Sequence, residues 1–227
     1  MPVTIAYIHT SPVLIPMFTN LTKKELPGAE QFHMVDESLI KNTIRARGLT
    51  KATIRRVLSL VQLAREGGAD AVVITCSSIG PAARVARSLF DFPILRVDEP
   101  MAEEAVRRGR RIGVAATLRT TLEPTVALLR EKAAAAGRPV EVVEALCEGA
   151  FEAVLSGDTH THDRLLSDAL MRLMDEVDVI VLAQASMARV IESLPPEAGR
   201  VPILSSPELA VQQLRAVLFP EPALTAH

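Results

Sequence analysis

Short runs of apolar, often β-branched residues alternate along the chain with longer amphipathic stretches rich in Ala, Leu and Arg. The apolar runs predict strands at residues 3–8, 71–75, 93–97, 111–116, 140–145, 177–183 and 201–205. The amphipathic stretches predict helices at residues 43–66, 81–90, 100–108, 121–136, 150–156, 160–175 and 207–217. The strand runs are apolar throughout, which is typical of parallel strands covered by helices on both faces. The pattern therefore predicts an α/β fold, with strand and loop only in residues 1–18.

Three segments of the first part of the chain recur, in the same order, in the second part. The pairs are residues 5–10 and 112–117, residues 70–78 and 178–186, and residues 92–95 and 201–204, at offsets of 107, 108 and 109. A nearly constant offset indicates two similar halves. We expect two pseudo-symmetric Rossmann- or flavodoxin-like halves, one formed by residues 1–98 with 207–227 and the other by residues 99–206. The active site is expected in the cleft between them.

Composition and charge exclude several function classes. The 227 residues carry a net charge of −2 and only 3% aromatic residues, so neither a basic surface nor a base-stacking platform for nucleic acid is expected. No run approaches the roughly 18 consecutive apolar residues of a membrane span. Two cysteines are too few for a secreted disulfide framework. We therefore expect a cytoplasmic protein whose partner is neither nucleic acid nor a membrane, and a homo-oligomer as the common default.

Small hydroxyl residues follow the predicted strands in both halves. Ligands of parallel α/β sheets bind at the carboxyl ends of the strands, so these loops form the candidate site. Hydroxyls and backbone N–H groups without Lys or Arg suit a small carboxylate better than a polyphosphate. The candidate substrate-binding residues are Ser11, Ser77, Ser78, Thr117, Thr120 and Ser186.

One cysteine occupies a strand end in the first half. Cys76 follows the strand predicted at 71–75 and precedes the helix predicted from Pro81. Because a helix N-terminus favours the thiolate, we expect the pKa of Cys76 to lie below its ordinary value of about 8.5. The alternative is a buried structural thiol, since free cysteine is among the most buried residue types.

These features together resemble the aspartate/glutamate/hydantoin racemase superfamily over most of the chain. They are the two similar halves, the segment Cys76-Ser77-Ser78 after a first-half strand, and a turn with Thr117 and Thr120 in the second half. The resemblance implies a cofactor-independent isomerase in which one cysteine thiolate removes a proton from the substrate's α-carbon and a second cysteine protonates the opposite face. It also implies that Cys76 is catalytic and that loop hydroxyls and N–H groups hold the carboxylate.

The sequence departs from the family pattern at the mirror position of Cys76, where Gln184 stands. Glutamine can only hydrogen-bond, so we expect Gln184 either to contact the substrate or merely to brace its loop. Cys147, after another second-half strand, is the candidate second thiol, with a buried structural cysteine as the alternative. Three functions stay open: a racemase or isomerase, a one-thiol lyase or one-base isomerase like the related arylmalonate decarboxylase and maleate isomerase, and a non-catalytic carboxylate-binding protein.

A pair of histidines in residues 157–163 suggests a metal site at first reading. His160 and His162 lack a third ligand nearby in the sequence, so we expect no metal. Asp158 or Thr159 is expected to cap the following helix, with both histidines in solvent.

Overall fold

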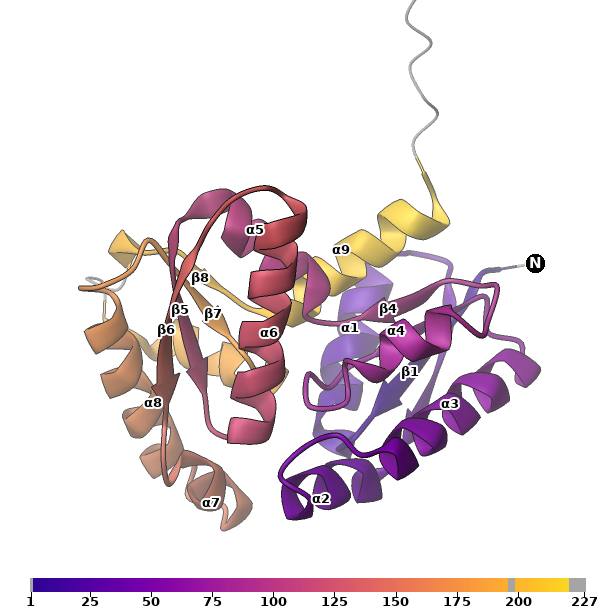
Figure 1. Cartoon of the computed structure of the whole chain (residues 1–227). Helices are drawn as coiled ribbons and strands as arrows, with labels where there is room; N and C mark the ends of the chain where they lie inside the picture. The colour runs from indigo at the N-terminus through magenta and orange to yellow at the C-terminus, as the bar shows by residue number, and fades with distance from the viewer. Residues whose placement is uncertain (1, 196–198, 221–227) are drawn as a thin grey trace, which may run out of the picture.

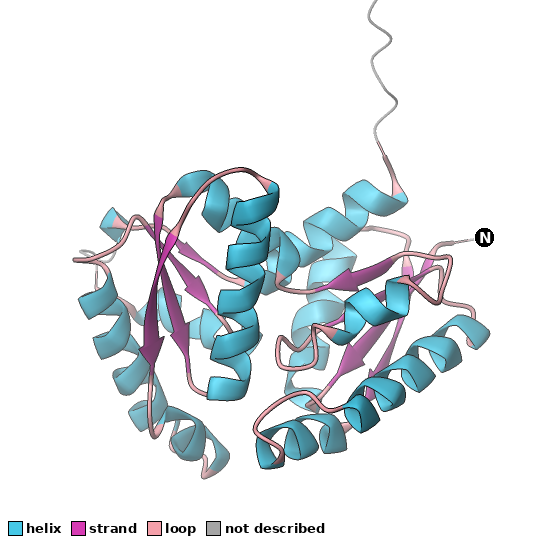
Figure 2. Cartoon of the chain, in the orientation of Figure 1, coloured by secondary structure: helices cyan, strands magenta, loops and turns pink. Residues whose placement is uncertain are grey.

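The computed structural model of the chain describes residues 2–195 and 199–220, which form two parallel sheets flanked by helices (Figures 1 and 2). The first part contains β1 (Thr4–His9), η1 (Pro12–Leu14), α1 (Ile15–Glu25), β2 (Glu30–Val35), α2 (Glu37–Arg45), α3 (Lys51–Glu66), β3 (Ala71–Ile74), α4 (Ala82–Arg87) and β4 (Ile94–Arg96). The second part contains α5 (Glu99–Arg108), β5 (Arg111–Ala116), α6 (Arg119–Ala135), β6 (Glu141–Leu146), α7 (Ala150–Leu155), α8 (Thr159–Leu173), β7 (Val179–Leu182), η2 (Ala185–Ser193), β8 (Ile203–Leu204) and α9 (Ser206–Leu218). Both η elements are short 3-10 helices.

The two sheets have the same topology. The strand order is β2-β1-β3-β4 in the first sheet and β6-β5-β7-β8 in the second, and all neighbouring strands are parallel. Ile5 pairs with Ala71 in the first sheet as Ile112 pairs with Val179 in the second. These partners are related by the offsets of the sequence repeat, so the predicted α/β fold with two similar halves is confirmed.

Helices cover both faces of each sheet. On the first sheet, Phe18 of α1 packs against one face with Tyr7 of β1, and Val57 of α3 packs against the other. On the second sheet, α5 and α6 cover one face and α8 covers the other. Figure 1 shows α6 on the side that faces the first half and α8 on the outer side.

The helix that follows the last strand of each sheet packs on the other sheet. Helix α5 follows β4 of the first sheet, yet Met101 and Ala105 belong to the core of the second. Helix α9 follows β8 of the second sheet, yet Ala210 and Leu214 belong to the core of the first, and the two helices contact one another (Figure 1). The division of the chain into residues 1–98 with 207–227 and residues 99–206 stays a prediction, and its residues 1 and 221–227 lie outside the described part.

Three elements near the N-terminus were not predicted, namely η1, α1 and β2. Strand β2 is an edge strand whose residues are at most partly buried, so polar side chains interrupt its apolar run. Helix α1 replaces the second part of the loop expected in residues 1–18. It buries only Phe18 and Thr22, too few for a recognisable apolar stripe.

The helix predicted at residues 43–66 corresponds to α3 and covers only residues 43–45 of α2, most of which was not predicted. Arg47 between them adopts a left-handed conformation with φ 54°, which ends the first helix. Thr50 then begins the second by accepting a hydrogen bond from the Thr53 N–H at 3.2 Å. Element η2 was also not predicted.

Within the described ranges 2–195 and 199–220, every helix is too short or too polar to cross a membrane.

Candidate functional site

Two hydrogen bonds join the strand ends of the two halves. Ser77 Oγ donates to the carbonyl oxygen of Ala183 at 3.0 Å, and Ser78 Oγ is hydrogen-bonded to Thr121 Oγ1 at 2.9 Å. These serines belong to the segment Cys76–Gly80, which we call the Cys76 turn. Because Ala183 follows β7 and Thr121 lies in the first turn of α6, the Cys76 turn meets the carboxyl-end loops of the second sheet.

Cys76 is partly buried, two residues after the end of β3. The hydroxyls of Thr10 and Ser78 and the backbone N–H groups of Ser78 and Ile79 are the polar groups that favour the thiolate form of Cys76. Burial raises the pKa of the thiol, although these groups act in the opposite direction. The expected lowering of this pKa is therefore wrong. The next helix, α4, begins only at Ala82 and has six residues. Its N-terminus is therefore distant from Cys76 along the chain, and its dipole is small.

Gln184 occupies the equivalent position in the second half, two residues after the end of β7. Its Oε1 accepts the backbone N–H of Thr117 at 2.7 Å, and its Nε2 donates to Thr117 Oγ1 at 2.7 Å. The pair Thr117 and Gln184 thus corresponds to Thr10 and Cys76, at offsets of 107 and 108 residues. Sequence reasoning missed Thr10 as a site residue, and the repeat offset applied to Thr117 would have found it.

The remaining predicted hydroxyls differ in their surroundings. Thr120 Oγ1 is a buried oxygen that has no hydrogen-bond partner among the described residues. Ser11 lies before η1 and is partly exposed, and its side chain makes no capping bond to that helix. Ser186 is exposed on η2, whereas its counterpart Ser78 is buried. The repeat is broken here because a 3-10 helix replaces the turn that precedes α4.

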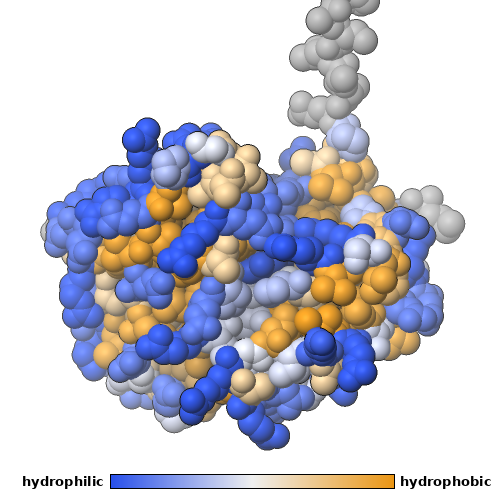
Figure 3. All heavy atoms as spheres, viewed as in Figure 1, coloured by the Kyte–Doolittle hydropathy of each residue, from blue (hydrophilic) through white to orange (hydrophobic). Residues whose placement is uncertain are grey.

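Cys147 lies after the edge strand β6, in the apolar cluster beneath α8. Burial raises the pKa of its thiol to about 11. The thiol lines a pocket of about 420 Å³ between β6 and α8, together with residues such as Glu144 and Arg172. Figure 3 shows apolar atoms exposed over this part of the second half. None of the other predicted site residues lines this pocket.

A chain of hydrogen bonds runs beneath the site from β3 to α1. His9 Nδ1 is hydrogen-bonded to Thr75 Oγ1 at 2.8 Å, and His9 Nε2 to His33 Nδ1 at 2.9 Å. His33 Nε2 is in turn hydrogen-bonded to Thr19 Oγ1 at 3.0 Å. Burial, aided by His33, lowers the pKa of His9 to about 4. His9 is therefore a neutral, fully buried ring near neutral pH.

The histidines near α8 do not form a metal site. His160 is exposed as expected, but His162 is buried and its Nδ1 is hydrogen-bonded to Asp163 at 2.7 Å. The expectation that both lie in solvent is thus wrong for His162, whose position on the inner face of α8 turns it to the core. Asp158 caps α8 as predicted, accepting the Thr161 N–H at 3.0 Å. In the part of the chain that the structure describes, no three metal-ligating side chains come together.

Comparison with models of protein families identifies one family. The family model described as Asp/Glu/Hydantoin racemase matches residues 8–214. No significant match was found among curated proteins.

Several solved structures share the fold. A glutamate racemase from Bacillus anthracis is 18% identical, with a TM-score of 0.72 over 95% of this chain and 81% of the other. An allantoin racemase from Klebsiella pneumoniae is 19% identical, with a TM-score of 0.68 over 95% and 87%. An aspartate racemase from Picrophilus torridus is 14% identical, with a TM-score of 0.67 over 94% and 93%.

Proposed function

Because the chain belongs to the Asp/Glu/hydantoin racemase family, we propose that it transfers a proton at the α-carbon of a small carboxylate or amino-acid derivative, with Cys76 as the base and without a cofactor. The observation that carries this proposal is the position of Cys76 on the turn that is bonded to the second half through Ser77 and Ser78, with hydroxyl and backbone N–H groups beside the thiol. These groups stabilise a thiolate at the point where the two halves meet.

The raised pKa of Cys76 suits proton abstraction from carbon. A thiol of higher pKa gives a thiolate that is a stronger base, while fewer molecules carry that thiolate at neutral pH. The thiolate takes the α-proton and becomes a thiol, and the electron pair left on carbon spreads into the adjacent carboxylate or carbonyl. Donors that surround this group stabilise the developing charge.

Thr120 is the first candidate to bind the substrate carboxylate, because its hydroxyl is buried without a partner in the described residues. Ser77, Ser78 and Thr117 already have partners within the protein. A substrate would exchange these hydrogen bonds for its own oxygens. We therefore propose Thr120 as an anchor and the three paired hydroxyls as groups that turn to the substrate on binding.

Gln184 favours a second candidate, one-sided proton transfer. Its amide oxygen and nitrogen are both bonded to Thr117, and an amide acts as neither an acid nor a base near neutral pH. With one thiol, the same face of the substrate loses and regains the proton. A lyase that removes a carboxyl group as CO₂ and then protonates the carbanion from Cys76 uses the same arrangement.

A deuterium-exchange screen tests the proposed function. The protein is incubated in D₂O with amino acids, hydantoins, malonates and maleate, and NMR follows the α-proton and the product. Exchange with inversion supports a racemase, exchange with retention supports one-sided transfer, and loss of CO₂ supports the lyase. Saturable binding without exchange or turnover across the panel would instead support a non-catalytic carboxylate-binding protein.

The variant Gln184→Cys should gain or increase racemisation, because it places a thiol at the position that mirrors Cys76. The measurement is the rate of appearance of the opposite enantiomer by chiral chromatography. Gln184→Ser is the matched control, since it also removes the amide bonds to Thr117 but supplies no thiol. Equal racemisation by the two variants would contradict the proposed opposition of positions 76 and 184.

A further inference from the structure

Arg96, the last residue of β4, is a buried charge outside the proposed chemistry. Its side chain is 7% exposed, and that of its partner Asp98 is 0% exposed. Arg96 Nε donates to Asp98 Oδ1 at 2.6 Å and Arg96 Nη2 to Asp98 Oδ2 at 2.9 Å. Removing such a pair from water is costly, and well-packed apolar residues are often as stable. The pair therefore calls for an explanation other than stability.

The guanidinium packs directly against the Cys76 turn. A Cβ atom at Gly80, the last residue of that turn, would lie 2.4 Å from Arg96 Nε and 3.0 Å from its Cδ and Cζ. Only glycine permits this approach. The turn is closed by bonds from the N–H of Ile79 to the carbonyl of Cys76 and from the N–H of Gly80 to the carbonyl of Ser77. Arg96 thus supports the segment that carries the proposed base.

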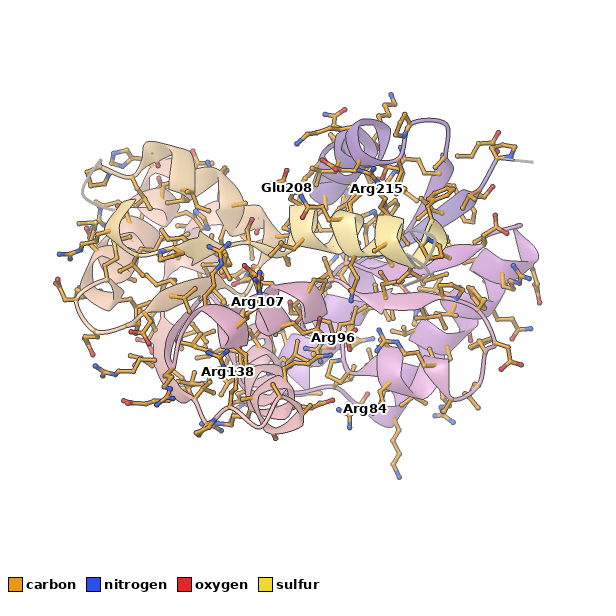
Figure 4. All side chains as sticks on the ribbon, turned by 90° about the horizontal axis from the view of Figure 1, so that it is seen from above. Arg84, Arg96, Arg107, Arg138, Glu208 and Arg215 are labelled. Carbon is orange, nitrogen blue, oxygen red and sulfur yellow. The ribbon has the colours of Figure 1, made fainter. Side chains whose placement is uncertain are left out.

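The same guanidinium also reaches the second half. Arg96 Nη2 donates to the carbonyl oxygen of Pro124 in α6 at 3.2 Å. The first turn of α6 carries Thr120 and Thr121, the latter bonded to Ser78 of the Cys76 turn. Figure 4 shows Arg96 at the boundary of the two halves, between the first-half ribbon and α6. One planar group therefore contacts the base-bearing turn and the helix that carries the candidate anchor.

We propose that Arg96, oriented by Asp98, is a positioning residue that holds the Cys76 turn against α6 and so sets the base relative to the carboxylate-binding hydroxyls. The catalytic part of this inference rests on the proposed function. Asp98 neutralises the guanidinium, so the role is one of geometry, and the planar fork of arginine is needed to reach both neighbours.

The test compares two disruptions of the same contact. Arg96→Met combined with Asp98→Asn removes both charges, so that neither is left buried alone. Gly80→Ala keeps both charges and displaces the guanidinium through its new Cβ. Arg84→Met is the control, because Arg84 (Figure 4) also joins the first half to α6, through an exposed ion pair with Glu131, but supplies none of the three atoms nearest to a Cβ at Gly80.

The first readout is the iodoacetamide alkylation rate of Cys76 at pH 7.5, with buried Cys147 of the same molecule as the internal standard for unfolding. Loosening the turn relieves the burial that raises the pKa of Cys76, so the ratio of the two rates should rise about tenfold in both disrupted proteins. The control should stay within about twofold of wild type. In the protein that already carries Arg96→Met and Asp98→Asn, Gly80→Ala should not raise the alkylation ratio further, because Gly80→Ala acts by displacing the guanidinium.

The second readout is α-proton exchange, where kcat should fall about 10²-fold in both disrupted proteins with KM changed by less than about threefold. An unchanged alkylation ratio in both folded disruptions, or an equal change in the control, would overturn the inference. The two proposals fail separately. Absence of α-proton exchange by the wild type with every acid tested would contradict the proposed function. The alkylation ratio would still show whether Arg96 holds the Cys76 turn in place.

Discussion

Replacing Cys76 by alanine should lower the rate of α-proton exchange by about 10³-fold, because general acid–base groups contribute about 10²- to 10⁴-fold. The variant lacks the proposed base, and the other cysteine, Cys147, lies in the apolar cluster beneath α8. The measurement is loss of the α-proton signal in D₂O. Thermal unfolding of the same variant shows that the protein is folded.

Cys147→Ala is the matched control for this prediction. Cys147 is buried and lines the pocket beside α8, so its replacement should change stability rather than exchange. Equal loss of exchange in both variants would give Cys147 a catalytic role, and full exchange in Cys76→Ala would contradict the proposed base.

Acidification from pH 6.5 to pH 4 should cost the protein about 3 kcal/mol of unfolding free energy through His9 alone. The pKa of His9 is about 4 in the folded protein against 6.5 for the free side chain, because the ring is buried and faces His33. Between these values the unfolded chain binds a proton that the folded chain does not. Stability therefore falls as the pH falls through this window, and the contribution of His9 levels off about one pH unit below its folded pKa.

Urea unfolding of wild type and His9→Asn at several pH values between 7 and 4 measures this contribution. Asparagine keeps a polar group near Thr75 but does not titrate. The difference in unfolding free energy between the two proteins should narrow by about 3 kcal/mol as the pH falls from 6.5 to 4. His160→Asn, on the exposed histidine, should follow the wild-type curve. If the unfolding free energies of wild type and His9→Asn changed in parallel with pH, the lowered pKa of His9 in the folded protein would be contradicted.

Most of the fold was predictable from the sequence, because buried parallel strands leave uninterrupted apolar runs. The runs that became β3 and β7 are entirely buried. Strand β2 was not predicted because it is an edge strand with polar residues. Helix α1 was not predicted because it buries only two side chains. The break between α2 and α3 depends on the left-handed conformation of Arg47, for which arginine gives no local signal.

The candidate site was predictable in part. The repeat located Cys76 and Gln184 at equivalent strand ends, and the structure places them beside the bonded pair Ser77 and Ala183. The environment of each group was not predictable. The pKa of Cys76 depends on burial, which involves segments remote in the sequence, and the close approach of Arg96 to Gly80 depends on the packing of β4 against the Cys76 turn.

The exchange of α5 and α9 between the halves has a consequence for the architecture as a whole. Helix α5 follows the first sheet and covers the second, and α9 follows the second sheet and covers the first. A single cleavage of the chain between the two sheets would therefore leave one of them without a helix that covers its core. Two copies of a single half that traded their last helices would form the same arrangement as a dimer. The present chain has the form of such a helix-swapped dimer joined end to end, which allows one copy to retain a thiol where the other carries an amide.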